Sequence, residues 1–243
     1  MIEPLLLTTT RITTFDDQRS LTNATGFFFR QGGRLFLVTS LHVVQDKASS
    51  HFPNRIEIEI HTDPSNLALA TDFSISLLKQ GKPVWRGTTD RAGVVDVAVI
   101  EINQADLPAD AFFCAFEASQ IPDIETSVEI GANALVVGFP LGFHDTLHHL
   151  PVVRHAIVAS TIGLRFQGNG YFLTDARTHR GSSGAPVVTK VDASVSGNDL
   201  SSWLLLGVHS SRLDIGTRDM QIDEALGLNC TWYADVLLTL TGP

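Results

Sequence analysis

Short stretches that alternate apolar and polar residues recur along the whole chain, and they constrain its fold more than any other feature. The clearest is 54–61, where isoleucine occupies every second position. Alternation with period two places one face of a β-strand on a core and the other in solvent. Many short strands separated by turn residues are typical of an all-β fold, either a barrel or a sandwich. The expected strands are 5–14, 25–30, 34–39, 54–61, 84–85, 94–102, 134–137, 152–162, 171–174, 186–189 and 203–208.

A softer segment at 108–125, with prolines and acidic residues, interrupts this pattern and is the expected connector between two halves. We therefore expect an N-terminal unit at 1–118 and a C-terminal unit at 119–243. Residues 231–240 have the one helical pattern and are expected to form a closing helix. The 243 residues, 44% of them apolar, suffice for a packed core.

Charge and cysteine content exclude several classes of protein. The net charge is −9 and no lysine or arginine cluster is present, so neither a nucleic acid nor an anionic membrane is an expected partner. Cys114 and Cys230 lie in apolar surroundings and are expected to be buried thiols rather than a disulfide. The N-terminus has no basic stretch followed by an apolar run, which predicts a cytoplasmic protein, or a secreted or periplasmic one if a signal was removed.

A glycine-flanked serine at 181–184 is the first candidate for chemistry. Gly181 and Gly184 let the backbone fold closely around Ser183, so that amide groups can point at one spot beside its hydroxyl. An oxyanion hole needs that geometry. Glycine and serine also fill ordinary turns, so the string needs a base and an acid elsewhere in the chain before it indicates a nucleophile.

His42 and Asp96 are the candidates for that base and acid. A lone histidine after a strand is more often structural, and His42 alone decides nothing. Asp96 lies in an apolar run at 94–100, where an ionised carboxylate is costly without a hydrogen-bonded partner. If His42 is that partner, Asp96 fixes the tautomer of the imidazole, which then takes the Ser183 proton.

Together these segments resemble the chymotrypsin-like serine peptidases, in which the triad has the order His42, Asp96, Ser183. The sequence is most similar to the bacterial branch of HtrA and glutamyl endopeptidases, through Thr-Asp-Ala at 174–176, Gly-Phe-Pro-Leu-Gly at 138–142 and the aspartate segment at 96–102. The resemblance implies two six-stranded antiparallel β-barrels with a C-terminal helix, the first carrying His42 and Asp96 and the second Ser183. It also implies an oxyanion hole made by the amides of Gly181 and Ser183.

The chain departs from this pattern at two positions beside the nucleophile. Ser182 stands where trypsin zymogens have an aspartate that pairs with a freed N-terminus, so zymogen activation of that kind is not expected. Ala185 replaces a glycine found in many relatives. No PDZ module follows the expected helix, so regulation through such a module is not expected either.

The same resemblance assigns Arg177, Thr178, His209 and Ser210 to the substrate pocket. A threonine and a histidine in these places resemble the pair that binds a Glu or Gln side chain in glutamyl endopeptidases and picornaviral main proteases. Cleavage after Glu or Gln follows, with Arg177 or Arg212 favouring Glu. The alternative is a shallow pocket for small aliphatic residues, with His209 in a core hydrogen bond.

One histidine cluster lies outside these motifs. His144 and His148 are four residues apart and could bind a metal ion on a helix. The segment follows a Gly-Phe-Pro-Leu-Gly turn and precedes Pro151, which favours a loop with solvated histidines. We therefore expect no metal and no cofactor.

Three functions remain open. The first is an active serine endopeptidase whose partner is a protein or peptide substrate. The second is a latent peptidase that an activating partner switches on by ordering the loops at 140–150 and 163–180. The third is an inactive binding protein with a peptidase fold.

Overall fold

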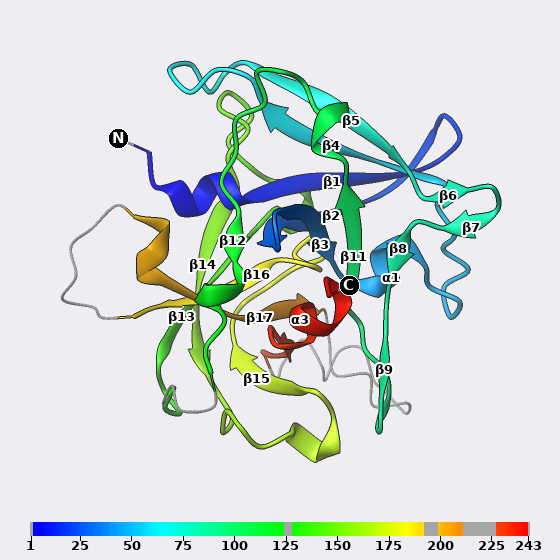
Figure 1. The fold of residues 1–243 in the computed structure, drawn as a ribbon. Coiled ribbons are helices and arrows are strands. Elements are labelled where there is room, and N and C mark those ends of the chain that lie inside the picture. Colours follow the sequence, from blue (N-terminus) through cyan, green and yellow to red (C-terminus); the bar gives the residue numbers. More distant parts are fainter. Residues whose placement is uncertain (1, 124–127, 192–198, 211–226, 243) are drawn as a thin grey trace.

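The computed structural model describes residues 2–123, 128–191, 199–210 and 227–242. Two β-systems lie one above the other in Figure 1. The N-terminal one is an eight-stranded sheet with the order β5-β4-β1-β2-β3-β11-β8, and β12 pairs with β2. Its strands are β1 (Thr9–Asp16), β2 (Arg19–Gln31), β3 (Arg34–Thr39), β4 (Arg55–His61), β5 (Ala70–Ser76), β8 (Trp85–Arg86), β11 (Ala98–Ile102) and β12 (Phe116–Glu117).

The C-terminal system is a closed barrel of six antiparallel strands in the order β13-β14-β15-β18-β17-β16. These are β13 (Asn133–Gly138), β14 (Val152–Val158), β15 (Tyr171–Asp175), β16 (Pro186–Lys190), β17 (Trp203–Ser210) and β18 (Leu228–Tyr233). Two small hairpins, β6–β7 (Leu78–Lys79 and Lys82–Pro83) and β9–β10 (Thr89–Asp90 and Gly93–Val94), lie outside both systems. The helices of the described residues are short: α1 (Leu41–Val44), α3 (Val236–Leu240) and six 3-10 turns, η1 to η6.

Alternation along the strands sorts side chains between separate cores. In β2, Phe27 and Phe29 belong to one apolar cluster and Phe28 to another. Successive side chains of a strand point to opposite faces, and β2 is covered on both, so all three rings are at most 1% exposed. In β4 the alternating isoleucines are buried, as predicted.

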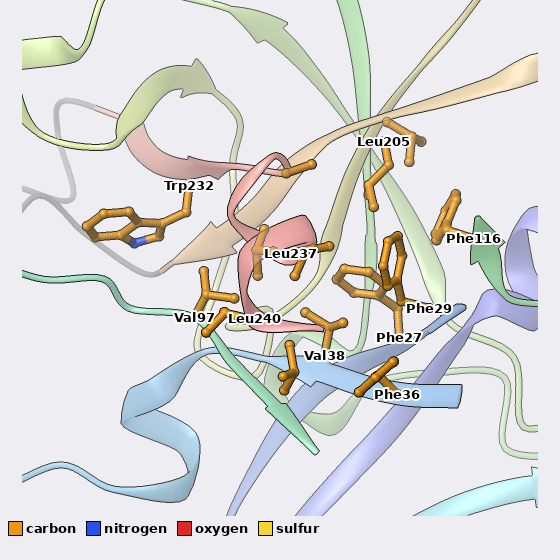
Figure 2. Packing of buried hydrophobic residues seen from close by; sticks show 14 of the residues in the cluster. Phe27, Phe29, Phe36, Val38, Val97, Phe116, Leu205, Trp232, Leu237 and Leu240 are labelled. Atoms are coloured by element: carbon orange, nitrogen blue, oxygen red, sulfur yellow. The ribbon is translucent and has the colours of Figure 1, made fainter. Parts of the chain in front are cut away.

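One core joins the two halves. It contains Phe27 and Phe29 from β2, Leu205 from β17, and Leu237 and Leu240 from α3. Figure 2 shows α3 inserted between these groups, with Leu237 and Leu240 facing the strands of both halves. The carbonyls at the end of the chain also accept hydrogen bonds from arginines of the first sheet. The last helix therefore fastens the barrel to the first sheet.

The all-β prediction and the closed six-stranded second barrel are confirmed. The first half differs from its prediction, because eight strands pair in a sheet whose end strands, β5 and β8, do not pair with each other in the described part of the chain. Strands of the first sheet end at Glu117 and those of the barrel begin at Asn133. The domain boundary between 118 and 119 falls in that interval and stays a prediction.

Two predicted elements were wrong in type. Residues 4–8 form the 3-10 turn η1 (Pro4–Thr8) rather than the start of a strand, because Pro4 favours the first turn of a helix. Residues 231–233 complete β18, and only Val236–Leu240 is helical. Pairing of Thr231 with Phe172 on β15 and with His209 on β17, the two neighbouring strands, overrides the local helical pattern.

Two further expectations can be compared with the structure. Cys114 is half-buried and Cys230 is buried, and both are thiols. Among the described residues, no helix has the length and apolar character needed to cross a membrane.

Candidate active site

His42 lies on α1, a single turn that follows β3. Its ring Nδ1 is 2.7 Å from Asp96 Oδ2, and its backbone amide donates to Asp96 Oδ1 at 2.9 Å. Because an ionised carboxylate only accepts, Nδ1 carries the proton and Nε2 is the free base. Burial lowers the pKa of His42, but the hydrogen bond and charge of Asp96, with a smaller contribution from Asp46, raise it above its ordinary value overall.

Asp96 was predicted inside a strand, and this was wrong. It lies in the irregular segment between β10 and β11, with Val95 and Val97 buried on either side. Its carboxylate accepts from the His42 amide, the His42 ring and the hydroxyl of Ser210, the last at 2.7 Å. Because Asp96 is not part of a strand, its side-chain direction is not fixed by the alternation between the two faces of a sheet, and it can reach all three donors.

Ser183 lies in the loop between β15 and β16, which packs against the first sheet. The Thr25 amide donates to the Ser183 carbonyl at 3.0 Å. Gly184 has φ +86, and a Cβ there would overlap the Thr25 carbonyl and the Thr39 hydroxyl. Only glycine allows this approach. The loop therefore touches the segment that leads into α1 and His42. Among the described residues, the Ser183 hydroxyl itself has no hydrogen bond to His42.

The peptide between Arg180 and Gly181 has a defined orientation. The Leu141 amide donates to the Arg180 carbonyl at 2.5 Å. In a trans peptide the C=O and the following N–H point in opposite directions, so the Gly181 N–H faces away from Leu141. Within the described chain, the amides of Gly181 and Ser183 have no intramolecular acceptor. Both remain able to donate to a substrate oxyanion.

Thr25 is a supporting residue that the sequence reasoning missed. Its hydroxyl donates to the Gly181 carbonyl at 2.7 Å and accepts from the Phe139 amide at 3.0 Å. One buried side chain from β2 thus ties the candidate oxyanion loop to the turn η4 (Pro140–Gly142). Its sequence context, a threonine before Gly26 at an apolar strand, carries no signal that would have singled it out.

Sequence comparison places this chain in a known family. A family model described as the trypsin-like peptidase domain matches residues 24–197. The chain belongs to the trypsin-like peptidase family. No curated protein matches it in a direct sequence search.

Solved structures of serine proteases share the fold of this trypsin-like peptidase. The serine endoprotease from Yersinia pestis is 16% identical, with a TM-score of 0.56 over 97% of this chain and 62% of its own. The Rv3671c protease of Mycobacterium tuberculosis, in an inactive form, is 16% identical with a TM-score of 0.51 over 98% of this chain and 91% of its own. The peptidase therefore spans less than two thirds of the Yersinia chain.

The residues predicted to line the substrate pocket differ from one another in burial and in hydrogen-bond partners. Arg177 is exposed, and Thr178 is half-buried and donates to Asn229 Oδ1 at 2.7 Å. Asn229 was not anticipated; it donates in turn to the Ala176 carbonyl at 2.6 Å and so ties the segment at 176–178 to β18. Ser210 directs its hydroxyl to Asp96 rather than to a pocket. Arg212 lies outside the described residues.

His209 on β17 is fully buried. Neither ring nitrogen has a hydrogen-bond partner among the described residues, and no hydrogen bond joins the ring to Thr178. Burial, with a smaller contribution from the nearby charge of His42, lowers the pKa of His209 to about 4. At neutral pH the ring is uncharged and offers one N–H donor and one acceptor nitrogen.

Proposed function

We propose that the chain is a serine endopeptidase that hydrolyses peptide bonds through an acyl-enzyme. The observation that carries the proposal is the hydrogen-bonded pair of His42 and Asp96 beside a glycine loop. That loop carries Ser183 and two amides, those of Gly181 and Ser183, with no acceptor among the described residues. A base, a group that orients it, a hydroxyl and oxyanion donors form the set that acyl transfer requires.

Each group has one part in the proposed reaction. Nε2 of His42 takes the proton from the Ser183 hydroxyl as the oxygen attacks the scissile carbonyl, and then gives it to the leaving amine. Asp96 holds the Nδ1–H tautomer and stabilises the imidazolium. The amides of Gly181 and Ser183 receive the negative charge on the carbonyl oxygen. A water molecule activated by His42 then releases the acyl group.

Labelling with a fluorophosphonate probe tests this chemistry directly. We expect the purified chain to be labelled, and Ser183→Ala to lose both labelling and peptide cleavage, the latter by roughly 10⁶-fold. Ser182→Ala is the matched control, because Ser182 is the buried neighbouring serine, and it should keep its label. A folded wild-type chain that neither labels nor cleaves under any condition would contradict the proposal.

A latent peptidase is the second candidate, and one observation favours it. The Ser183 hydroxyl and the His42 ring are not hydrogen-bonded in the described structure, although apo sites often tighten this contact only with substrate. Labelling that requires an added cell extract or protein factor would favour latency. Labelling of the purified chain at once would favour constitutive activity. A folded protein that is labelled under neither condition would favour the third hypothesis, an inactive binding protein with a peptidase fold.

Cleavage after Glu or Gln is the finer part of the proposal. A fully buried imidazole with two unpaired nitrogens carries an unmet hydrogen-bonding demand, which a substrate amide or carboxyl group would meet. Sites built this way reject substrates that lack the group by large factors. The hydroxyl of Thr178 already donates to Asn229, so towards a substrate it acts as an acceptor, a role that suits the amide of Gln.

Profiling a peptide library tests the specificity. We expect enrichment of Gln and Glu on the acyl side of the cut. In His209→Leu, which fills a similar volume without nitrogens, the preference should fall by about 10²-fold or more. Thr178→Ser keeps the hydroxyl and serves as the control. Enrichment of small aliphatic residues in the wild type would instead support the shallow-pocket alternative.

A further inference from the structure

The loop at 143–150 of the barrel docks on β4 of the first sheet. Its ends are held by a bridge between Asp145 and Leu150. His61 Nε2, on β4, is 2.8 Å from the His148 carbonyl across the two halves. The His148 side chain is about half exposed and bonds Asp145 within its own turn. The loop prediction is therefore confirmed, and the pair of His144 and His148 is not on a helix. The prediction that these histidines are solvated holds for His148 but not for His144, which is half-buried and bonded to the Gly142 carbonyl.

The loop instead brings two histidines to a glutamate of the other half. Glu59, His144 and His149 each offer one ligand atom, and these atoms lie within 4.8 Å of one another. Glu59 Oε2 is 3.7 Å from His149 Nδ1. Both of these atoms are buried, and neither has a hydrogen-bond partner among the described residues. A carboxylate oxygen and an imidazole nitrogen without hydrogen-bond partners among the described residues thus face each other, with His144 as the third candidate ligand.

Hydrogen bonds to neighbouring groups already orient His144 and Glu59 as metal ligands would be oriented. His144 Nδ1 is 2.7 Å from the Gly142 carbonyl, which fixes the proton on Nδ1 and leaves a lone pair on Nε2. Metal-binding histidines usually donate their other N–H in this way. Arg11 Nη2 binds Glu59 Oε1 at 2.5 Å and leaves Oε2 directed at His149. Asp72, which pairs with Glu59 across β4 and β5, adds negative charge that offsets Arg11.

We infer that Glu59, His144 and His149 form a binding site for a divalent transition-metal ion, best suited to Zn²⁺. Two imidazoles and one carboxylate form a donor set that zinc accepts, with water as the fourth ligand. Imidazole donors select against Mg²⁺ and Ca²⁺. Bonds of 2.0–2.2 Å in a tetrahedron separate ligand atoms by about 3.3–3.6 Å. The 3.7 Å between Glu59 Oε2 and His149 Nδ1 is close to this range. The most widely separated ligand atoms, at up to 4.8 Å, reach it when side-chain rotation moves them about 1 Å closer together.

Such an ion would connect the two halves at a place that leads to the oxyanion loop. Glu59 belongs to β4, whereas His144 lies two residues after the end of η4. The amide of Leu141, within η4, holds the Arg180 carbonyl and thereby the orientation of the Gly181 amide. Bound metal would therefore stabilise the contact between sheet and barrel, and the turn that positions the candidate oxyanion donors.

Calorimetric titration of the 243-residue Ser183→Ala chain with ZnCl₂ tests the site without self-cleavage and without reference to peptidase activity. We expect one equivalent of Zn²⁺ to bind and to raise the unfolding temperature, because a ligand of the folded state stabilises it. Mg²⁺ should do neither. Co²⁺ in the same site should give the intense visible absorption of tetrahedral coordination.

Variants identify the ligands. His144→Gln and His149→Asn should each weaken Zn²⁺ binding by at least about tenfold. Loss of a residue that only hydrogen-bonds a ligand already costs that much, and loss of the ligand itself should cost no less. Asparagine suits position 149 because its φ is +54. His155→Gln is the control, since His155 is an exposed histidine of β14 outside the cluster. Absence of stoichiometric binding by the folded chain, or affinity unchanged in both ligand variants, would overturn the inference.

Discussion

At the scale of single residues, Asp96 shows why a charged side chain is tolerated in an apolar segment. Three donors from two parts of the chain satisfy its carboxylate. Ser210 brings one of them from the barrel, so the pair formed by His42 and Asp96 is fixed from both halves. A carboxylate held in this way keeps the imidazole in one tautomer.

Asp96→Asn should therefore abolish most activity while leaving the fold intact. The amide would donate to His42 and favour the wrong tautomer, which lowers kcat by roughly 10⁴-fold in Ser-His-Asp enzymes. Steady-state cleavage of a peptide substrate measures the loss. Asp46→Asn is the matched control, because it removes a charge that raises the pKa of His42 but makes no hydrogen bond to the ring. The acid limb of the pH–rate profile should therefore shift slightly, while the maximal kcat stays the same. A similar loss in both variants would argue against tautomer control.

Buried His209 should make the protein less stable as the pH falls. Its pKa is lowered to about 4 from an ordinary 6.5, so between these values the unfolded chain binds a proton that the folded chain does not. Stability then decreases as pH falls through this window, by about 3 kcal/mol for this one group. Urea unfolding at pH 7 and pH 4.5 measures the difference. The glutamine in His209→Gln cannot titrate, so this variant should lose less free energy of unfolding between the two pH values, by most of that amount. Equal losses in both proteins would contradict a buried, neutral His209.

At the scale of elements, the loop that carries Ser183 depends on Thr25 of β2. The hydroxyl bonds both the Gly181 carbonyl and the Phe139 amide in a buried place. Thr25→Val keeps the shape but leaves both backbone groups unsatisfied, at about 1–3 kcal/mol each. We expect lower stability in urea together with a reduced kcat, because the oxyanion loop loses its anchor. Thr25→Ser restores the hydroxyl and should recover most of both; a valine variant with normal kcat would show that the anchor is not needed.

The elements also show how far the sequence alone could lead. Alternation at 54–61 predicts a strand from a local pattern, and the structure has it as β4. The segment at 231–233 looked helical, yet pairing with two neighbouring strands decides its conformation. Such pairing depends on residues far away in the chain, which local propensity does not record.

The same limit applies to the sites. His42, Asp96 and Ser183 could be proposed because their order along the chain and their local motifs are unusual. The contacts of Thr25, Asn229 and Ser210 arise only when strands from distant parts of the chain meet. Glu59 lay in a regular alternating strand, where nothing distinguished its side chain from a solvated one. The cluster with His144 and His149 exists only through docking of the two halves.

At the scale of the whole molecule, we expect the shared core to make the two halves one cooperative unit. Side chains of the first sheet, the barrel and α3 pack in a single cluster. Each half alone would expose that apolar surface to water, which is costly. The candidate active site draws His42 and Asp96 from one half and Ser183 from the other, so its geometry depends on this packing.

Leu237→Ala should therefore destabilise both halves together. Leu237 is fully buried in the shared core, whereas Leu238, next to it on α3, is 40% exposed. Removing the buried side chain leaves a cavity and should cost about 2–5 kcal/mol, while Leu238→Ala should change stability by less than about 0.5 kcal/mol. Hydrogen exchange read by mass spectrometry should show faster exchange in β2 and β17 alike for Leu237→Ala only. Loss of protection confined to the barrel would mean that the two halves unfold independently and that α3 is an appendage of one of them.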